Sequence, residues 1–145
     1  MFPPQRKVGK EISEFFAPYL SDSKSVLDIG CGNGRVLKWL DAKGSFQYTG
    51  VDISTKIVAH AKQIHSMRVS AKFMHANIIA LPFSDSAFDI CFAIAVLHHI
   101  PSSKLREQAL REVMRVLKPE AMRFLQTGIC FSFDFFNLSF ILCYS

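Results

Sequence analysis

Short runs rich in apolar residues recur along this chain, separated by stretches with a different spacing. The runs precede Asp28 and span residues 46–51, 71–76 and 88–95, and the last of them is apolar at almost every position. Runs of this length predict buried strands, and a nearly unbroken one is typical of a strand covered on both faces.

Between the runs, apolar residues recur every three or four positions, as on one face of a helix. This spacing predicts helices over residues 35–42, from Ser54 onwards, and from Ser102 to Pro119. Both serines are suitable N-caps, and proline ends a helix. Strands that alternate with helices predict an α/β fold: a doubly wound parallel sheet with right-handed crossovers and helices on both faces.

The two ends of the chain depart from this pattern within what we expect to be one domain, residues 1–145. The pattern predicts an amphipathic lead-in helix within residues 1–22 and a core formed by residues 24–119. Residues 120–145 end in an apolar stretch that is too short and too polar for a membrane span, which needs about 20 apolar residues. We therefore expect no membrane contact, and a tail in which the last strands of the fold are missing or replaced.

Composition adds little that is specific. The 145 residues are 50% hydrophobic and 20% charged, which indicates a globular protein. The net charge of +5 comes from scattered lysines and arginines, which usually solvate a surface and favour an anionic partner only weakly. The four cysteines show no metal-binding spacing and no signal peptide is visible, so we expect reduced thiols and a cytoplasmic location.

The strongest chemical signal is the sequence V-L-D-I-G-C-G-N-G at residues 26–34. Gly30, Gly32 and Gly34 let the backbone turn sharply after a strand and approach a ligand before a helix begins. One βαβ unit later comes Asp52, whose carboxylate can hold two ribose hydroxyls. An adenosine compound is therefore the expected ligand, the alternative being a tight strand-to-helix turn without one.

The glycine spacing separates two kinds of adenosine compound. A loop that binds a pyrophosphate usually reads G-x-G-x-x-G, whereas here it reads G-x-G-x-G with Asp28 just ahead. A carboxylate at this point opposes a pyrophosphate but suits a ligand that carries an ammonium and a sulfonium group. A nicotinamide-dependent oxidoreductase is thereby disfavoured.

The D-x-G-x-G-x-G loop resembles the first motif of the class I S-adenosylmethionine-dependent methyltransferases, specifically the type 11 methyltransferase domain. The resemblance continues in order with Asp52-Ile53, with Ala76-Asn77-Ile78, with residues 88–100 and with R-E-V-M-R-V-L-K-P at residues 111–119. It covers roughly residues 24–119. In relatives the run V-L-K-P is followed by a Gly-Gly turn and a fifth strand, whereas Glu120 follows here, which suggests a truncated or altered C-terminus.

The resemblance implies a Rossmann-like fold, S-adenosylmethionine as cofactor, and a set of cofactor-binding residues. The glycine loop would hold the methionine part, Asp52 the ribose, Asn77 the adenine amino group, and Ala95 would line the floor near the methyl group. Many relatives have Asp where this chain has Asn77, but an amide oxygen can also accept a hydrogen bond. The whole set is Asp28, Gly30, Cys31, Gly32, Gly34, Asp52, Ile53, Asn77, Ile78 and Ala95.

Methyl transfer needs few catalytic side chains, because the sulfonium already activates the methyl group and orientation carries most of the rate. His98 could act as a base for a hydroxyl or amine acceptor, with His99 beside it, or the two could merely pack and cap a turn. The remaining histidines lack metal-ligand spacing, so no metal is expected.

The methyl acceptor stays open. The phrase I-A-V-L-H-H-I followed by R-V-L-K-P also resembles the tRNA wobble-uridine carboxymethyl methyltransferases, which esterify an ionised carboxylate that needs no base. Small-molecule methyltransferases carry a similar phrase. A tRNA or a small molecule is thus the expected acceptor, and a cofactor-binding remnant or interaction module without activity is the alternative.

Overall fold

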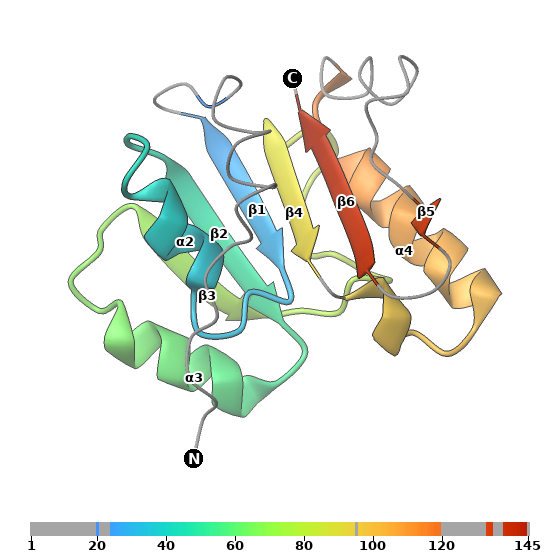
Figure 1. Cartoon of the computed structure of the whole chain (residues 1–145), viewed down its shortest axis with the longest axis horizontal. Coiled ribbons are helices and arrows are strands. Elements are labelled where there is room, and N and C mark those ends of the chain that lie inside the picture. The colour runs from blue at the N-terminus through green and yellow to red at the C-terminus, as the bar shows by residue number, and fades with distance from the viewer. Residues whose placement is uncertain (1–19, 21–23, 95, 120–132, 135–137, 145) are drawn as a thin grey trace.

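The computed structural model describes residues 20, 24–94, 96–119, 133–134 and 138–144, and these form one six-stranded sheet with helices against it (Figure 1). The strand order is β3-β2-β1-β4-β6-β5. The strands are β1 (Ser25–Ile29), β2 (Gln47–Asp52), β3 (Ala71–His75), β4 (Ile90–Ile94), β5 (Phe133–Asp134) and β6 (Leu138–Tyr144). The first four run parallel, so the predicted doubly wound parallel sheet is confirmed.

The helices are α2 (Arg35–Leu40), α3 (Thr55–Ile64), the short 3-10 helix η2 (Leu97–His99) and α4 (Ser103–Val116). The predicted N-caps of α3 and α4 are confirmed: the hydroxyl of Ser54 accepts from the Ile57 amide, and that of Ser102 from the Leu105 amide, both at 3.4 Å. The predicted lead-in helix lies outside the described residues. Within the part of the chain that is described, no helix is long and apolar enough to cross a membrane.

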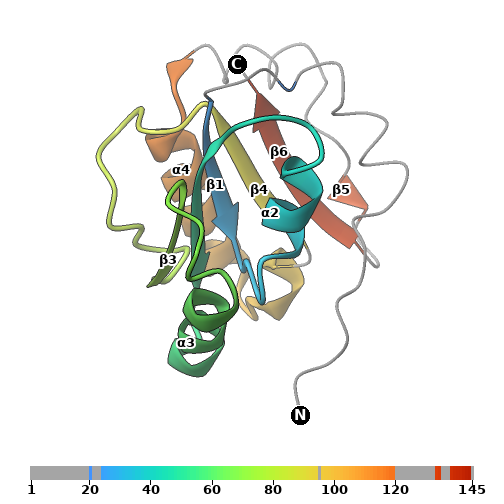
Figure 2. The same cartoon turned by 90° about the vertical axis from the view of Figure 1, so that its left-hand side faces the viewer.

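Two layers of apolar side chains cover the sheet, one on each face, as the sequence predicts. On one face α2 and α3 pack over the alternate residues of the parallel strands, including Val26, Tyr48 and Phe92. On the other face α4 and the segment after β3 pack over Leu27 and Val51 among others. Figure 2 shows α2 and α4 on opposite sides of β1 and β4.

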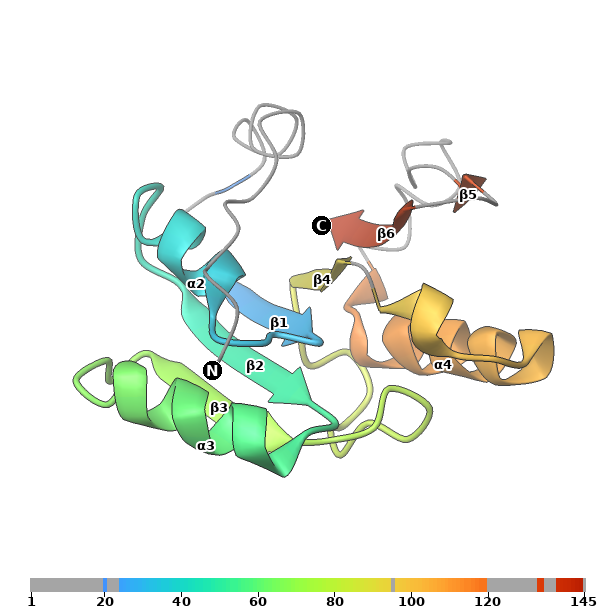
Figure 3. The same ribbon diagram turned by 60° about the horizontal axis from the view of Figure 1, so that its bottom comes forward.

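All four parallel strands end at the same edge of the sheet, which is where the candidate site lies. In the register of β1 and β2, Asp28 faces Gly50 and Ile29 faces Val51, so the loops after these strands are neighbours. The helix α3 lies beside β2 and β3, whereas α4 lies on the side of β4 and β6 (Figure 3). Ligands of open α/β sheets bind outside this carboxyl edge.

The opposite edge, where β1 and β4 begin, is tied together by Asp89. Its Oδ2 accepts from the backbone amide and the hydroxyl of Ser25 at 2.8 and 2.6 Å, and its Oδ1 accepts from Nζ of Lys118 at 2.8 Å. Burial opposes the ionisation of Asp89, but the bonds from Lys118 and Ser25 outweigh it and lower its pKa. The start of both central strands is thus fixed by one carboxylate.

The tail contributes an antiparallel strand. In the described part of the tail, β6 pairs with β4 so that Ile90 faces Tyr144 and Ile94 faces Phe140, and β5 pairs with β6. The resemblance to methyltransferases leads one to expect a fifth strand in this part of the chain, followed by a closing antiparallel pair. The expectation that the last strands are replaced is consistent with this arrangement.

Candidate functional site

The loop between β1 and α2 adopts a left-handed conformation at every second residue. The φ angles are 68° at Gly30, 57° at Gly32 and 82° at Gly34, a region that glycine enters without steric strain. The amides of Gly30 and Cys31 both donate to the carbonyl of Val51, at 2.8 and 3.0 Å, and so fasten the loop to the end of β2.

The three glycines meet different surroundings. A Cβ at Gly30 would lie 2.5 Å from Cγ2 of Val96, and a Cβ at Gly34 would lie 2.5 Å from Nε2 of His65. A Cβ at Gly32 would have nothing within 4 Å. Gly30 and Gly34 are therefore needed for packing within the protein, whereas the open side of Gly32 is available to an approaching molecule.

Asp52 lies at the end of β2 and is hydrogen-bonded to this loop. Its Oδ2 accepts from the amide of Gly32 at 3.2 Å, and its Oδ1 accepts from the amide of Ser54 at 2.9 Å. The side chain is only partly buried. Because each carboxylate oxygen has a second lone pair, Asp52 can still accept two further hydrogen bonds, as a ribose diol requires. Next to it, Ile53 is 67% exposed and offers a free apolar surface.

Asp28 is close to the loop, but its carboxyl group faces the interior. The side chain is 2% exposed, and Oδ2 accepts a 2.6 Å hydrogen bond from the hydroxyl of Tyr48. Burial raises the pKa of Asp28 to about 7, although the bond from Tyr48 and the charge of Arg35 act in the opposite direction. The sequence analysis predicts Asp28 to be a negative charge beside the loop. In the structure its carboxyl group is buried and its pKa lies near neutral pH.

Two other residues that the resemblance assigns to the cofactor point their side chains into the protein. Cys31 is 4% exposed, and burial raises the pKa of its thiol, which disfavours the reactive thiolate form. Ile78 is 7% exposed and belongs to the apolar layer under α4. Only backbone atoms of these two residues remain for a ligand.

Asn77 follows β3 in a tight turn at the same edge of the sheet. Its side-chain oxygen accepts from the amide of Ile79 at 3.2 Å, and its carbonyl accepts from the amide of Ala80 at 3.0 Å. The side chain is partly buried. One side-chain acceptor position is thus used by the turn, and the second lone pair of the oxygen remains for a ligand.

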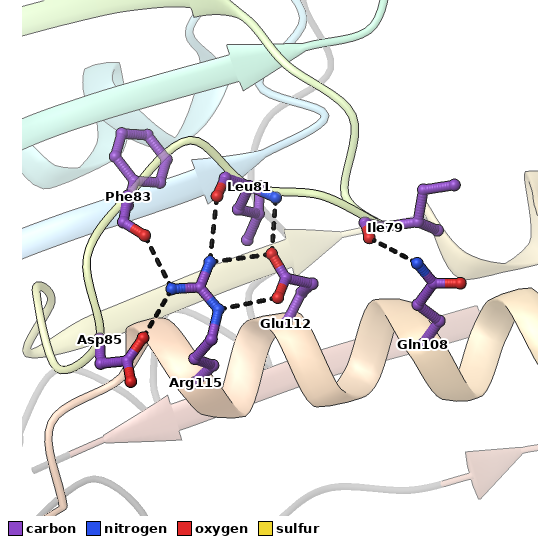
Figure 4. Close-up of polar contacts among 7 residues, drawn as sticks. All are labelled: Ile79, Leu81, Phe83, Asp85, Gln108, Glu112 and Arg115. Carbon is purple, nitrogen blue, oxygen red and sulfur yellow. Dashed lines mark hydrogen bonds and ion pairs between the residues drawn. The ribbon is translucent and has the colours of Figure 1, made fainter.

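The segment after this turn is held by α4 through a network that the sequence did not predict (Figure 4). The amide of Leu81 donates to Oε2 of Glu112 at 2.7 Å, and the side-chain amide of Gln108 donates to the carbonyl of Ile79 at 2.9 Å. Hydrogen bonds from Arg115 lower the pKa of Glu112. Glu112 and Arg115 lie on the polar face of R-E-V-M-R at residues 111–115. From the sequence alone, such a face indicates only an exposed helix surface.

Arg115 completes this network. It donates to the carbonyls of Leu81 and Phe83 at 3.0 and 2.7 Å, to both carboxylate oxygens of Glu112 at 2.8 and 2.9 Å, and to Asp85 at 2.8 Å. A guanidinium group has five N–H donors, and all five are used here. The backbone that follows Asn77 is therefore fixed by a planar group that lysine could not replace.

The remaining candidates are His98, His99 and Ala95. The two histidines are exposed in η2, after β4, with their ring centroids 4.0 Å apart. This position is compatible with a base, but among the residues that the structure describes neither ring has a hydrogen bond to another candidate residue. Ala95 lies outside the described residues. Within those residues no three His, Cys, Asp or Glu side chains form a group that could hold a metal ion.

Comparison with known proteins identifies the family of this chain. Residues 27–125 match the family described as Methyltransferase domain, which is more than half of the chain. The chain therefore belongs to this family. One similar solved structure is that of a SAM-dependent methyltransferase from Methanosarcina mazei. It is 31% identical with a TM-score of 0.66, and the match covers 79% of this chain and 55% of that chain.

Curated relatives of this chain are also named as methyltransferases. The O-methyltransferase resE of Aspergillus sclerotiorum is 32% identical over 117 residues, which are 79% of this chain and 41% of that protein. The tRNA (carboxymethyluridine(34)-5-O)-methyltransferase of Arabidopsis thaliana is 34% identical over 104 residues, 72% of this chain and 24% of that protein. The chain spans less than half the length of these curated relatives. S-adenosylmethionine is the cofactor of the family.

Proposed function

We propose that this chain binds S-adenosylmethionine at the carboxyl edge of β1 and β2, and that the protein transfers the methyl group to an oxygen acceptor. The observation that carries the proposal is the contact between Asp52 and the amide of Gly32. It brings the carboxylate expected to hold a ribose against the one glycine of the loop whose Cβ position is open.

The residues at this edge fit the cofactor in three places. Asp52 would hold the ribose hydroxyls, and the exposed side chain of Ile53 would cover one face of the adenine. The loop of Gly30, Gly32 and Gly34 would hold the methionine part, with Cys31 contributing backbone only. Asn77 would accept from the adenine amino group, and Asp28, Ile78 and Ala95 complete the proposed set.

When bound, S-adenosylmethionine supplies a methyl group already activated by its sulfonium. The chain's own residues are then left with binding and orientation, which account for most of the rate in a displacement of this kind. Asp52 fixes the sugar. The amides of Gly30 and Cys31, which donate to the carbonyl of Val51, fix the loop beside Asp52. His98 is exposed after β4 and would take a proton only from an acceptor that is not already ionised.

The acceptor is proposed to be an oxygen of a small molecule or of a tRNA carboxymethyl group. Both curated relatives described above are named for transfer to oxygen. A carboxylate acceptor is ionised at neutral pH and needs no general base. Such an acceptor would not require proton transfer to His98, which is exposed after β4.

Thermal unfolding with S-adenosylhomocysteine tests the cofactor assignment. At about 100 times the dissociation constant, a ligand that binds only the folded state stabilises it by about 2.7 kcal/mol. For a domain of this size the melting temperature should rise by roughly 5–10 °C. NADH at the same concentration should do much less, because its pyrophosphate would find no G-x-G-x-x-G loop.

Two variants sharpen the test. Asp52→Ala should abolish most of the shift, whereas Asp41→Ala removes an exposed carboxylate at the end of α2, paired with Arg68, and should leave the shift intact. A larger shift with NADH, or an unchanged shift in Asp52→Ala, would contradict the proposal. Binding without transfer of labelled methyl groups to RNA or small-molecule extracts would favour a binding module instead.

A further inference from the structure

A row of three aromatic rings connects the two ends of the glycine loop. The ring of Tyr48, on β2, lies 5.6 Å from that of Phe73, on β3. The ring of Phe73 is stacked on His65 at 5.3 Å with an interplanar angle of 16°. Tyr48 donates to Asp28 just before the loop, and His65 contacts the loop just before α2. No part of this row was expected from the sequence.

The contact between His65 and the loop is a hydrogen bond of defined direction. Nε2 of His65 lies 2.9 Å from the carbonyl oxygen of Asn33. A carbonyl can only accept, so Nε2 carries the hydrogen and donates. The same nitrogen would lie 2.5 Å from a Cβ at Gly34, so the ring edge lies directly against the Cα of that glycine.

The ring of His65 is held on the other side by the end of α3. His65 is the C-cap residue of this helix, and its amide donates to the carbonyl of Ala61 at 3.0 Å. Its own carbonyl accepts from the amide of Arg68 at 3.0 Å, which fixes the turn that follows. Phe73, 6% exposed, supplies the flat surface against which the ring lies. The donor is therefore presented by rigid elements.

We propose that His65 is a positioning residue for the cofactor site: by donating to Asn33 and packing on Gly34, it sets the conformation of the glycine loop. The expected effect of His65 on cofactor affinity rests on the proposed function, whereas its expected effect on the conformation of the loop does not. The peptide of Asn33 lies between Gly32, whose amide meets Asp52, and the start of α2. Fixing that carbonyl holds the end of the loop that leads into α2, whereas the bonds from Gly30 and Cys31 to Val51 hold its beginning.

The experiment replaces the donor and keeps the ring. In His65→Phe the stacking on Phe73 is retained and the hydrogen bond is lost, and we expect the affinity for S-adenosylhomocysteine, measured by calorimetry below the melting temperature, to fall about 3- to 10-fold. His65→Gln restores a side-chain donor of similar reach and should recover most of the affinity. Gln63→Ala, at an exposed position two residues earlier on α3, should bind like the unchanged protein.

Hydrogen exchange in the protein without ligand gives a second, independent measurement. The amides of Gly34 and Lys38, which donate to the carbonyls of Cys31 and Gly34, should exchange faster in His65→Phe and recover in His65→Gln. His65→Met, which also lacks a donor and adapts to its packing, takes the place of His65→Phe if that variant does not fold.

The outcomes separate the two proposals. Unchanged exchange and affinity in His65→Phe, or a His65→Gln that behaves no better than His65→Phe, overturn the positioning role. If the unchanged protein binds no S-adenosylhomocysteine, the proposed function fails, while the exchange measurement still decides whether His65 holds the loop.

Discussion

The hydroxyl of Tyr48 donates to Oδ2 of Asp28 at 2.6 Å across the pair of strands β1 and β2, and both side chains are buried. Burial raises the pKa of Asp28 to about 7, against an ordinary value of 3.8. We therefore expect the carboxyl group that precedes the glycine loop to change its charge near neutral pH, and the stability of the fold to depend on that change.

The first prediction is a pH dependence of stability. A carboxyl whose pKa is higher in the folded than in the unfolded state binds more protons when folded, so its contribution is complete below about pH 4 and is lost as pH rises through about 7. Asp28→Asn does not titrate. The free energy of unfolding of the unchanged protein should fall relative to that of Asp28→Asn by roughly 2–4 kcal/mol over this range.

Urea unfolding at a series of pH values measures this difference. Tyr48→Phe serves as a second variant: it removes the hydrogen bond from the Tyr48 hydroxyl, which stabilises the ionised form of Asp28, so the transition should move to higher pH. A difference between the unchanged protein and Asp28→Asn that stays constant from pH 4 to pH 8 would show that Asp28 is not the titrating group.

The second prediction distinguishes the three glycines. Alanine in a left-handed conformation costs about 1–2 kcal/mol at each position. At Gly30 and Gly34 the new Cβ would also meet Val96 or His65, whereas at Gly32 it would meet nothing. Gly30→Ala and Gly34→Ala should therefore lose more stability than Gly32→Ala in urea unfolding, while Gly32→Ala should lose S-adenosylhomocysteine affinity without a matching loss of stability. Equal losses of stability at all three positions would contradict the interpretation that Gly30 and Gly34 are packed against the protein and Gly32 is open.

The third prediction concerns the network in which α4 holds the segment after Asn77. Glu112→Ala leaves the amide of Leu81 without its partner and should lower the free energy of unfolding by about 1–3 kcal/mol. Glu107→Ala is the matched control on the same helix, because its pair with Arg111 is exposed and such pairs contribute less than about 1 kcal/mol. Similar losses in both variants would mean that the network contributes no more than a surface pair.

The fourth prediction separates binding from transfer. His98 is exposed after β4 and makes no described contact with the glycine loop or Asp52. His98→Ala should therefore leave the S-adenosylhomocysteine-induced melting shift within about 1 °C of that of the unchanged protein. A loss of the shift would place His98 in the cofactor site rather than beside an acceptor.

The fold was largely predictable because it depends on short-range patterns. A nearly continuous apolar run such as that of β4 is typical of a strand covered on both faces, and Ser54 and Ser102 mark helix starts by local hydrogen bonding. The direction of β6 was not predictable, because antiparallel and parallel strands differ in chain path and not in local sequence.

The site was predictable as a position in the chain and less so as a set of side chains. The pattern D-x-G-x-G-x-G indicates a loop at a strand end, but it does not say which way Asp28 or Cys31 points, and both are buried. The same holds for Ile78 in the segment Ala76-Asn77-Ile78. His65 lies 32 residues from Asn33, so only the fold brings them together. Whether the proposed set holds the cofactor stays a prediction.

The strand order has a consequence for the course of folding. The pairs β1–β2 and β2–β3 join neighbours in the chain, but β1–β4 and the bond between Ser25 and Asp89 close a loop of 64 residues. Contacts between distant residues bear a larger entropic cost before they are stabilised. We expect the first three strands to assemble early and β4 to dock late, so in stopped-flow measurements Asp89→Asn should speed unfolding more than it slows folding. The opposite result would place β4 in the folding nucleus.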